Sequence, residues 1–188
     1  MAGLVAVLAL AGLAGCTGSQ AVDPQAGGAR RFVQGSGTVS EYAPADRKPL
    51  PAVRGTLLGG GTLDLADLRG KVVVLNFWGS WCAPCRAEAQ TLEEVYQATK
   101  ASGVAFVGVN VRDSESKAKA FNRTFGVTYP SLFDEAGRVA ISLREAPPNA
   151  IPATILIDRA GRVAMVFRKP LLMRELRPAV DRLAAEPG

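Results

Sequence analysis

A continuous apolar run that leads into a closely spaced pair of cysteines constrains the fold of this chain more than any other feature. The run covers Val72–Trp78, and Cys82 and Cys85 follow it after a short turn. A short apolar run of this kind predicts a buried strand, and the residues from Cys85 onward have the pattern of a helix. The two cysteines therefore lie at a strand-to-helix junction, with the first thiol at the N-terminus of a helix.

This position predicts a reactive cysteine pair. Unpaired backbone N–H groups and the helix dipole stabilise a thiolate at a helix N-terminus. The two-residue spacer also lets the sulfur of Cys85 reach that of Cys82. We therefore expect a dithiol–disulfide exchange site, with Cys82 as the exposed nucleophile and Cys85 as the resolving thiol. A static structural bridge is the alternative, although so short a loop would constrain the unfolded chain little.

The residue counts narrow the chemistry further. A structural zinc site usually takes four Cys or His ligands, whereas this chain has three cysteines and no histidine. The absence of histidine also excludes Ser-His-Asp and Cys-His catalysis. The formal net charge is +5, but basic and acidic residues are mixed along the chain, so no nucleic-acid-binding patch is predicted. We expect neither a metal nor another cofactor.

The N-terminus has the pattern of an export signal. Residues 2–15 form an uncharged apolar stretch that is too short to span a bilayer. The stretch ends in Leu13-Ala14-Gly15-Cys16, which resembles the bacterial lipoprotein signal and predicts cleavage before Cys16 and lipidation of that cysteine. A plain secretory signal with an incidental cysteine is the alternative. No Lys or Arg precedes the apolar core, which leaves the true start codon open.

The chain divides into three predicted parts. These are a lipoprotein signal peptide over residues 1–15, a flexible tether over 16–48 and a folded domain over 49–188. The tether is rich in Gly, Ser, Ala, Gln and Pro and has neither a helical nor a strand period. About 30 flexible residues have a span of roughly 30 Å, which would let the domain search the outer face of a membrane.

The hydrophobic pattern of the domain predicts an α/β fold. The expected order is a β-hairpin, a strand, a helix, a strand, a helix, a second β-hairpin and a last helix, which implies a mixed central sheet with helices on both faces. The strands expected outside the first hairpin cover residues 72–78, 104–110, 153–158 and 162–167, with a further short strand over 139–143. The helices are expected to begin near residues 82, 114 and 174.

Three segments together resemble one known family. They are residues 76–86, 114–126 and 151–158, and they are similar to the TlpA/ResA group of thioredoxin-fold, membrane-anchored thiol–disulfide oxidoreductases. The resemblance covers about residues 49–186. It implies a thioredoxin fold with an N-terminal β-hairpin and a helical insert, at the extracytoplasmic face of the cell membrane. It also implies reduction of protein disulfides, such as those of apocytochrome c cysteines, with electrons from a membrane protein.

The same resemblance assigns substrate-binding residues. Pro152 matches the family's cis-proline, and the backbone of the preceding residue, Ile151, would pair with an extended substrate segment. An ordinary trans proline at the start of an edge strand is the alternative. Trp81, adjacent to Cys82, is expected to form an apolar rim for a partner peptide, or else to serve packing alone.

Glu88 is the carboxylate that the resemblance links to catalysis. It lies one helical turn after Cys85, where the group often carries a glutamate linked to thiol proton transfer. Thioredoxins proper have a buried aspartate on the preceding strand, and here Asn76 takes that place and cannot be a base. The alternative for Glu88 is a solvated residue on the helix surface. Gln90 replaces the family's helix-kinking proline, so we expect a straighter helix.

The direction of electron flow is not fixed by the sequence, because it depends on the reduction potential relative to the compartment. Reduction is our prediction, and a disulfide oxidase for secreted proteins is the alternative in the same class. A thioredoxin-fold peroxidase usually has a lone peroxidatic cysteine with Thr and Arg nearby, which the Cys82–Cys85 pair argues against. A lipoprotein that binds a partner without turnover is the alternative outside the enzymes.

Overall fold

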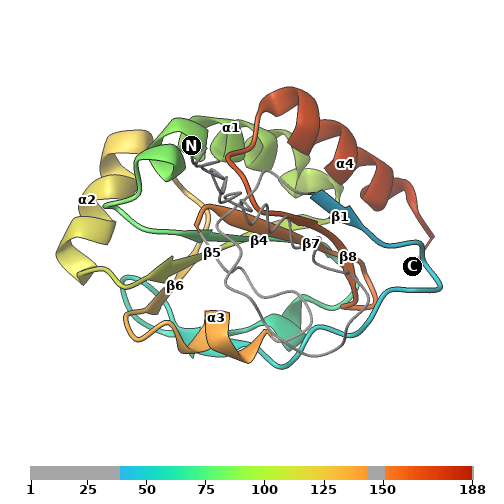
Figure 1. Ribbon diagram of the computed structural model, residues 1–188, viewed down its shortest axis with the longest axis horizontal. Coiled ribbons are helices and arrows are strands. Elements are labelled where there is room, and N and C mark those ends of the chain that lie inside the picture. The colour runs from blue at the N-terminus through green and yellow to red at the C-terminus, as the bar shows by residue number, and fades with distance from the viewer. Residues whose placement is uncertain (1–38, 144–150, 188) are drawn as a thin grey trace, which may run out of the picture. The chain divides into compact units, whose positions relative to one another are not determined.

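A computed structural model describes residues 39–143 and 151–187 of the chain (Figure 1). A six-stranded sheet with the strand order β1-β8-β7-β4-β5-β6 lies at its centre. A separate two-stranded hairpin consists of β2 and β3. The strands are β1 (Val39–Glu41), β2 (Arg54–Thr56), β3 (Thr62–Asp64), β4 (Val72–Trp78), β5 (Val104–Val111), β6 (Ser131–Asp134), β7 (Ala153–Ile157) and β8 (Val163–Phe167).

Helices cover both faces of the sheet (Figure 1). They are α1 (Ala83–Thr99), α2 (Glu115–Phe125), α3 (Arg138–Ser142) and α4 (Met173–Ala185), with two short 3-10 helices, Leu65–Leu68 and Lys100–Ser102. The helices α1 and α4 pack together on one face, and α3 and the β2–β3 hairpin lie on the other. The α/β prediction with a mixed sheet is therefore confirmed.

The central strand β4 is buried along its whole length because both of its faces are covered. Val72 and Val74 pack against α1 and α4, whereas Val73 and Leu75 face the opposite core. Side chains alternate along a strand, so Asn76 lies on the face of α1. The strand runs parallel to β5 and antiparallel to β7, which brings the start of β7 to the end of β4.

The folded domain begins before residue 49. The strand β1 lies in the segment predicted to be a tether, and Val39 pairs with Phe167 of β8. The buried guanidinium of Arg47 then bonds to Asp158 at 3.4 Å and to Glu186 at 2.5 Å. The tether prediction is therefore wrong for residues 39–48, because a three-residue edge strand among Gly, Ser and Pro leaves no detectable period. The rest of the tether, the signal peptide and Cys16 lie outside the described residues.

The region after β5 also differs from the prediction. The strand β6 was not predicted, and the strand expected over residues 139–143 is instead the helix α3. The apolar residues there are consistent with either state, but the Asp134 carboxylate accepts hydrogen bonds from the backbone N–H groups of Arg138 (2.7 Å) and Val139 (2.9 Å). Those bonds satisfy the first donors of a helix. In the first hairpin, β2 begins at Arg54.

Candidate active site

The cysteine pair lies where β4 ends and α1 begins. Cys82 is the N-cap residue of α1, and its sulfur forms a disulfide with that of Cys85. The backbone N–H of Cys85 also donates to the Cys82 sulfur at 3.2 Å. Pro84, in the first turn, has no N–H and a φ suited to a helix start. The junction predicted from the sequence is therefore present, with the Cys82 sulfur at the helix N-terminus.

Cys82 was predicted to be exposed, but in this disulfide form it is buried. Its exposed fraction is 4% and that of Cys85 is 1%. The reason is α2, whose residue Phe121 packs against Trp78 of β4 with 4.4 Å between ring centroids. These two rings and Ala118 belong to one apolar cluster with both cysteines. The site is thus an apolar one, with the cysteines beneath its surface.

Glu88 lies inside the domain, one turn after Cys85. It is 1% exposed, so the alternative of a solvated surface glutamate is wrong. Its Oε1 accepts a hydrogen bond from Asn76 Nδ2 (2.9 Å), and its Oε2 accepts one from the Leu171 backbone N–H (2.9 Å). Burial raises the pKa of Glu88 to about 7, although both hydrogen bonds act in the opposite direction. The carboxyl group can therefore gain or lose a proton near neutral pH.

Asn76 joins this carboxylate to the strand β7. Its amide Nδ2 donates to Thr154 Oγ1 at 3.0 Å as well as to Glu88. Tyr129 is also buried, and its pKa is raised above the usual range by burial and by the nearby charge of Glu88. Sequence reasoning missed Thr154, Leu171 and Tyr129. The polar Asn76 within an apolar strand was the available signal, because a buried amide needs polar partners.

The peptide bond between Ile151 and Pro152 is cis, as the resemblance implied. Pro152 is buried immediately before β7, and Ile151 packs against the apolar cluster that contains Cys82 and Cys85. The residues expected to bind substrate and the disulfide therefore lie in one place. In α1, Gln90 is exposed and bonds to Glu94, and the helix runs from Ala83 to Thr99 as one segment.

Trp81 is the exposed aromatic residue next to the disulfide. Its exposed fraction is 54%, and its indole Nε1 donates to the Arg112 carbonyl at 3.0 Å. The ring lies over Gly79, where a Cβ would come within 2.8 Å of the indole Nε1. Glycine at position 79 therefore makes room for the ring.

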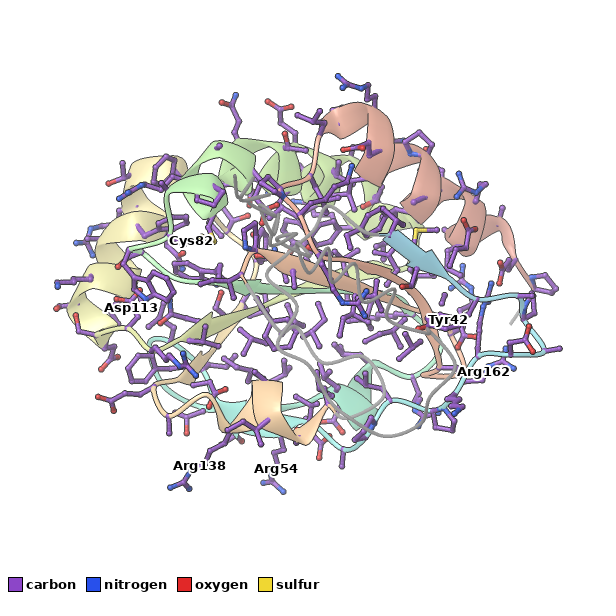
Figure 2. All side chains as sticks on the ribbon, viewed as in Figure 1. Tyr42, Arg54, Cys82, Asp113, Arg138 and Arg162 are labelled. Carbon is purple, nitrogen blue, oxygen red and sulfur yellow. A yellow bond between two sulfur atoms is a disulfide. The ribbon has the colours of Figure 1, made fainter. Side chains whose placement is uncertain are left out.

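The turn that leads into Cys82 is fixed by a carboxylate that the sequence did not indicate. Asp113 accepts hydrogen bonds from the backbone N–H (2.6 Å) and the Oγ (2.8 Å) of Ser80. Figure 2 shows Cys82 and Asp113 on the side of the domain where α2 packs. Burial acts to raise the pKa of Asp113, but hydrogen bonds from Ser80, Asn110 and Ser114 together hold the pKa below its usual value.

The described residues contain neither a candidate metal site nor a candidate membrane-spanning helix. Within residues 39–143 and 151–187, no cluster of three or more His, Cys, Asp or Glu side chains could bind a metal ion. Among the helices described there, none has the length and apolar character needed to cross a bilayer.

The mixed sheet, the helices on its two faces and the cysteine pair at the start of α1 define a thioredoxin fold. Residues 47–166 match the AhpC/TSA family, and the chain belongs to that family.

The chain is similar to the thiol-disulfide oxidoreductases ResA of Geobacillus kaustophilus, with 38% identity over 112 residues, and of Bacillus subtilis, with 37% identity over 107 residues. These matches cover 60% and 57% of this chain and 63% and 58% of the relatives. The chain thus matches less than two thirds of the length of these relatives. The predicted resemblance to the ResA group is confirmed.

Solved structures cover more of the chain. The structure of a DsbF homologue from Corynebacterium diphtheriae is 37% identical and has a TM-score of 0.74, and it matches 84% of this chain. A secreted thiol-disulfide isomerase from Corynebacterium glutamicum is 35% identical with a TM-score of 0.76, and it matches 85%. Both match over their whole length.

Proposed function

We propose that this chain is a thiol–disulfide oxidoreductase that reduces disulfides in other proteins through Cys82 and Cys85. The observation that carries the proposal is the disulfide at the N-terminus of α1, with the buried Glu88 carboxyl one turn further along the helix. The similarity to ResA and to secreted disulfide-exchanging proteins supports it.

The proposed reaction moves two electrons from the protein dithiol to a substrate disulfide. The Cys82 thiolate attacks one sulfur of the substrate, a mixed disulfide forms, and the first substrate thiolate leaves. The Cys85 thiolate then attacks the Cys82 sulfur, the intramolecular disulfide forms, and the second substrate thiolate leaves. Each leaving thiolate takes up one proton. The 3.2 Å bond from the Cys85 N–H to the Cys82 sulfur supports the proposal that the helix N-terminus stabilises the thiolate of reduced Cys82.

Glu88 is the proposed base for the second step. The Cys85 thiol must lose its proton before it can attack, and the cysteines lie in an apolar cluster. A carboxyl group with a pKa of about 7 accepts a proton far better near neutral pH than one with an ordinary pKa, since its basicity is higher. We assign substrate binding to the exposed ring of Trp81 and to the backbone at Ile151 and Pro152.

Burial of both cysteines supports the reducing direction, because burial offsets part of the stabilisation that the N-terminus of α1 gives the Cys82 thiolate. Strong oxidants of this class owe their high potential to stabilisation of the reduced form. In this chain both cysteines are buried, which disfavours the charged thiolate. Ionised Glu88 would add a negative charge one turn away. A weakly stabilised reduced form gives a low reduction potential, which suits a reductant.

We place the protein at the extracytoplasmic face of the cell membrane, anchored by lipid on Cys16. The lipoprotein-like sequence before Cys16 supports this location, as does the secreted relative from C. glutamicum. Proposed substrates include the haem-binding cysteines of apocytochrome c. The oxidised protein would then receive two electrons from a membrane donor protein.

Insulin reduction and the reduction potential test this proposal. Wild-type protein should reduce insulin, whereas Cys82→Ser and Cys85→Ser should not turn over, and the potential should lie below about −250 mV. A wild-type protein that does not reduce insulin would indicate instead a binding protein with a structural disulfide. Rapid consumption of peroxide without insulin reduction would favour a peroxidase.

A disulfide oxidase or isomerase is the second candidate. The observation that favours it is the similarity to the secreted thiol-disulfide isomerase over 85% of this chain. A potential near or above about −180 mV would support it, because known isomerases and oxidases lie in that range.

A further inference from the structure

Three unusual features meet at the C-terminal end of β5. Asn110 is fully buried, and its Oδ1 has no hydrogen-bond partner in the described part of the chain. Arg112 has a φ of 50°, which among residues 39–143 and 151–187 is the one positive value outside glycine. Asp113 is a carboxylate that is only 8% exposed. Left-handed backbone in such residues and buried polar atoms without partners both cost free energy, and they concentrate at functional segments.

This segment contacts both residues that precede Cys82. Asp113 accepts two hydrogen bonds from Ser80, one from its backbone N–H and one from its hydroxyl. The adjacent carbonyl of Arg112 accepts the bond from the indole of Trp81. The left-handed turn at Arg112 redirects the chain, so that these neighbouring groups reach the same turn. Three bonds thus fix the link between β4 and the nucleophilic cysteine.

Asp113 also accepts hydrogen bonds from its own neighbours in the chain, which hold its carboxylate in place. Its Oδ1 accepts a bond from the Ser114 backbone N–H (2.9 Å), and its Oδ2 accepts one from Asn110 Nδ2 (3.1 Å). Ser114 is the N-cap residue of α2, the helix that covers the disulfide. The carboxylate therefore connects the turn before Cys82 to both β5 and α2.

We propose that Asp113 is a positioning residue that holds the Ser80–Trp81 turn, so that the sulfur of reduced Cys82 stays at the N-terminus of α1. The proposal rests on the proposed function in that Cys82 is taken as the reacting thiol. In the disulfide form, the bond to Cys85 holds the Cys82 sulfur in place. Once that bond is reduced, the position of the sulfur depends on the residues before it. The contacts of Asp113 therefore matter most in the state that attacks substrate.

Asp158 provides a matched control. It is 5% exposed, and it fixes the β7–β8 turn by accepting a bond from the Arg162 backbone N–H at 2.8 Å. It follows Ile157, which pairs with Val73 at the start of β4, whereas the cysteines follow the end of β4. Figure 2 shows its partner Arg162 on the opposite side of the view from Cys82.

The experiment measures alkylation of Cys82 in the reduced full-length chain with iodoacetamide across pH, with the modified residue located by mass spectrometry. Asp113→Asn replaces one of the two carboxylate oxygens that accept the Ser80 bonds with an NH2 donor, so we expect alkylation at pH 7 to slow by about fivefold and the thiol pKa to rise. Ser80→Ala removes one bond without a change of charge and should slow alkylation by about twofold. Ser80→Thr keeps the hydroxyl and should restore the rate, and Asp158→Asn should react like the wild type.

A second measurement follows Trp81 directly. Hydrogen exchange of its indole N–H, followed by NMR, should be faster in Asp113→Asn but not in Asp158→Asn. Unchanged or faster alkylation of Cys82 in Asp113→Asn would overturn the positioning role. If that variant does not fold, a Ser80→Ala protein that reacts like the wild type would overturn it. Wild-type protein without insulin reduction would refute the proposed function instead, and the alkylation rates would still report on the position of Cys82.

Discussion

Two buried carboxylates, those of Glu88 and Asp158, differ in the charge of the groups that bond to them. Glu88 is 1% exposed and Asp158 is 5% exposed. Glu88 accepts hydrogen bonds from neutral donors, the side chain of Asn76 and a backbone N–H. Asp158 instead contacts the guanidinium groups of Arg47 and Arg162. Burial is almost equal in the two cases, so the charge of their partners is what distinguishes the two carboxylates.

The arginine-rich region serves the fold. Arg47 bonds to Glu186 near the end of the chain and holds the pKa of that carboxyl below its usual value. It thereby joins the segment after β1 to the residue after α4. Glu88 has no such opposite charge among its hydrogen-bond partners in the described residues, so desolvation dominates and its pKa rises to about 7. A carboxyl group that titrates near neutrality is suited to proton transfer rather than to stability.

The largest effect is expected for the chemistry at Glu88. Glu88→Gln removes the group that takes the Cys85 proton, so resolution of a preformed Cys82 mixed disulfide at pH 7 should slow by about 100-fold. Stopped-flow measurement between pH 5 and 9 should show an inflection near 7 in the wild type and none in the variant. Asp158→Asn should keep the inflection. Equal rates in wild type and Glu88→Gln would refute the role of Glu88.

Glu88 should also make stability depend on pH. Its pKa in the folded protein is about 7, against 4.5 for an exposed glutamate, so the unfolded state releases this proton first and ionisation disfavours folding. The free energy of unfolding of the wild type, relative to Glu88→Gln, should therefore fall by about 2 kcal/mol between pH 5 and pH 8. Urea unfolding at both pH values measures this. Parallel changes in the two proteins would show that Glu88 does not titrate in this range.

Arg47→Ala tests the other carboxylate. The variant removes a buried guanidinium, and Arg162 remains as a partner for Asp158, so we expect a loss of about 2 kcal/mol in the free energy of unfolding. The alkylation rate of Cys82 should not change, because the contacts of Arg47 are structural. A large change in Cys82 reactivity without loss of stability would contradict this division of roles.

The smallest effect is expected at Thr154. Thr154→Val removes the acceptor for Asn76 and should lower the free energy of unfolding by about 1 kcal/mol. It should also shift the pH dependence of mixed-disulfide resolution, because Asn76 orients Glu88. Thr99→Val is the matched control, since Thr99 is a buried residue whose hydroxyl bonds to the Val95 carbonyl within α1. Identical pH profiles for the two variants would exclude the link through Asn76.

Local patterns in the sequence were enough to predict the centre of the fold. The apolar run of β4, the cysteine spacing and Pro84 together predict a buried strand, a turn and a helix start, and each acts over a few residues. The burial of Glu88 was not predictable in the same way. The buried carboxylate accepts a hydrogen bond from the Leu171 backbone N–H, which lies 83 residues further along the chain.

The remaining errors have similar causes. The strand β1 is three residues long and exists because β8 offers an edge, so its own residues carry no signal. Cys82 is buried because α2 packs over the site, which no feature of the motif itself reveals. Asp113 follows a predicted strand, but its contact with Ser80 spans 33 residues. Local sequence predicted the longer strands and helices, whereas the contacts between distant elements formed the site.

The most direct test of the proposed mechanism is to trap a mixed disulfide. The reduced full-length Cys85→Ser variant, mixed with an oxidised protein substrate such as insulin, should accumulate an adduct at Cys82 that dithiothreitol releases, because the resolving thiol is absent. Cys82→Ser should form little or none, since Cys85 lies inside the first turn of α1 and only Cys82 lies at the helix N-terminus that stabilises a thiolate. Adducts that form mainly at Cys85, or in neither variant, would contradict the account and leave the disulfide a structural one.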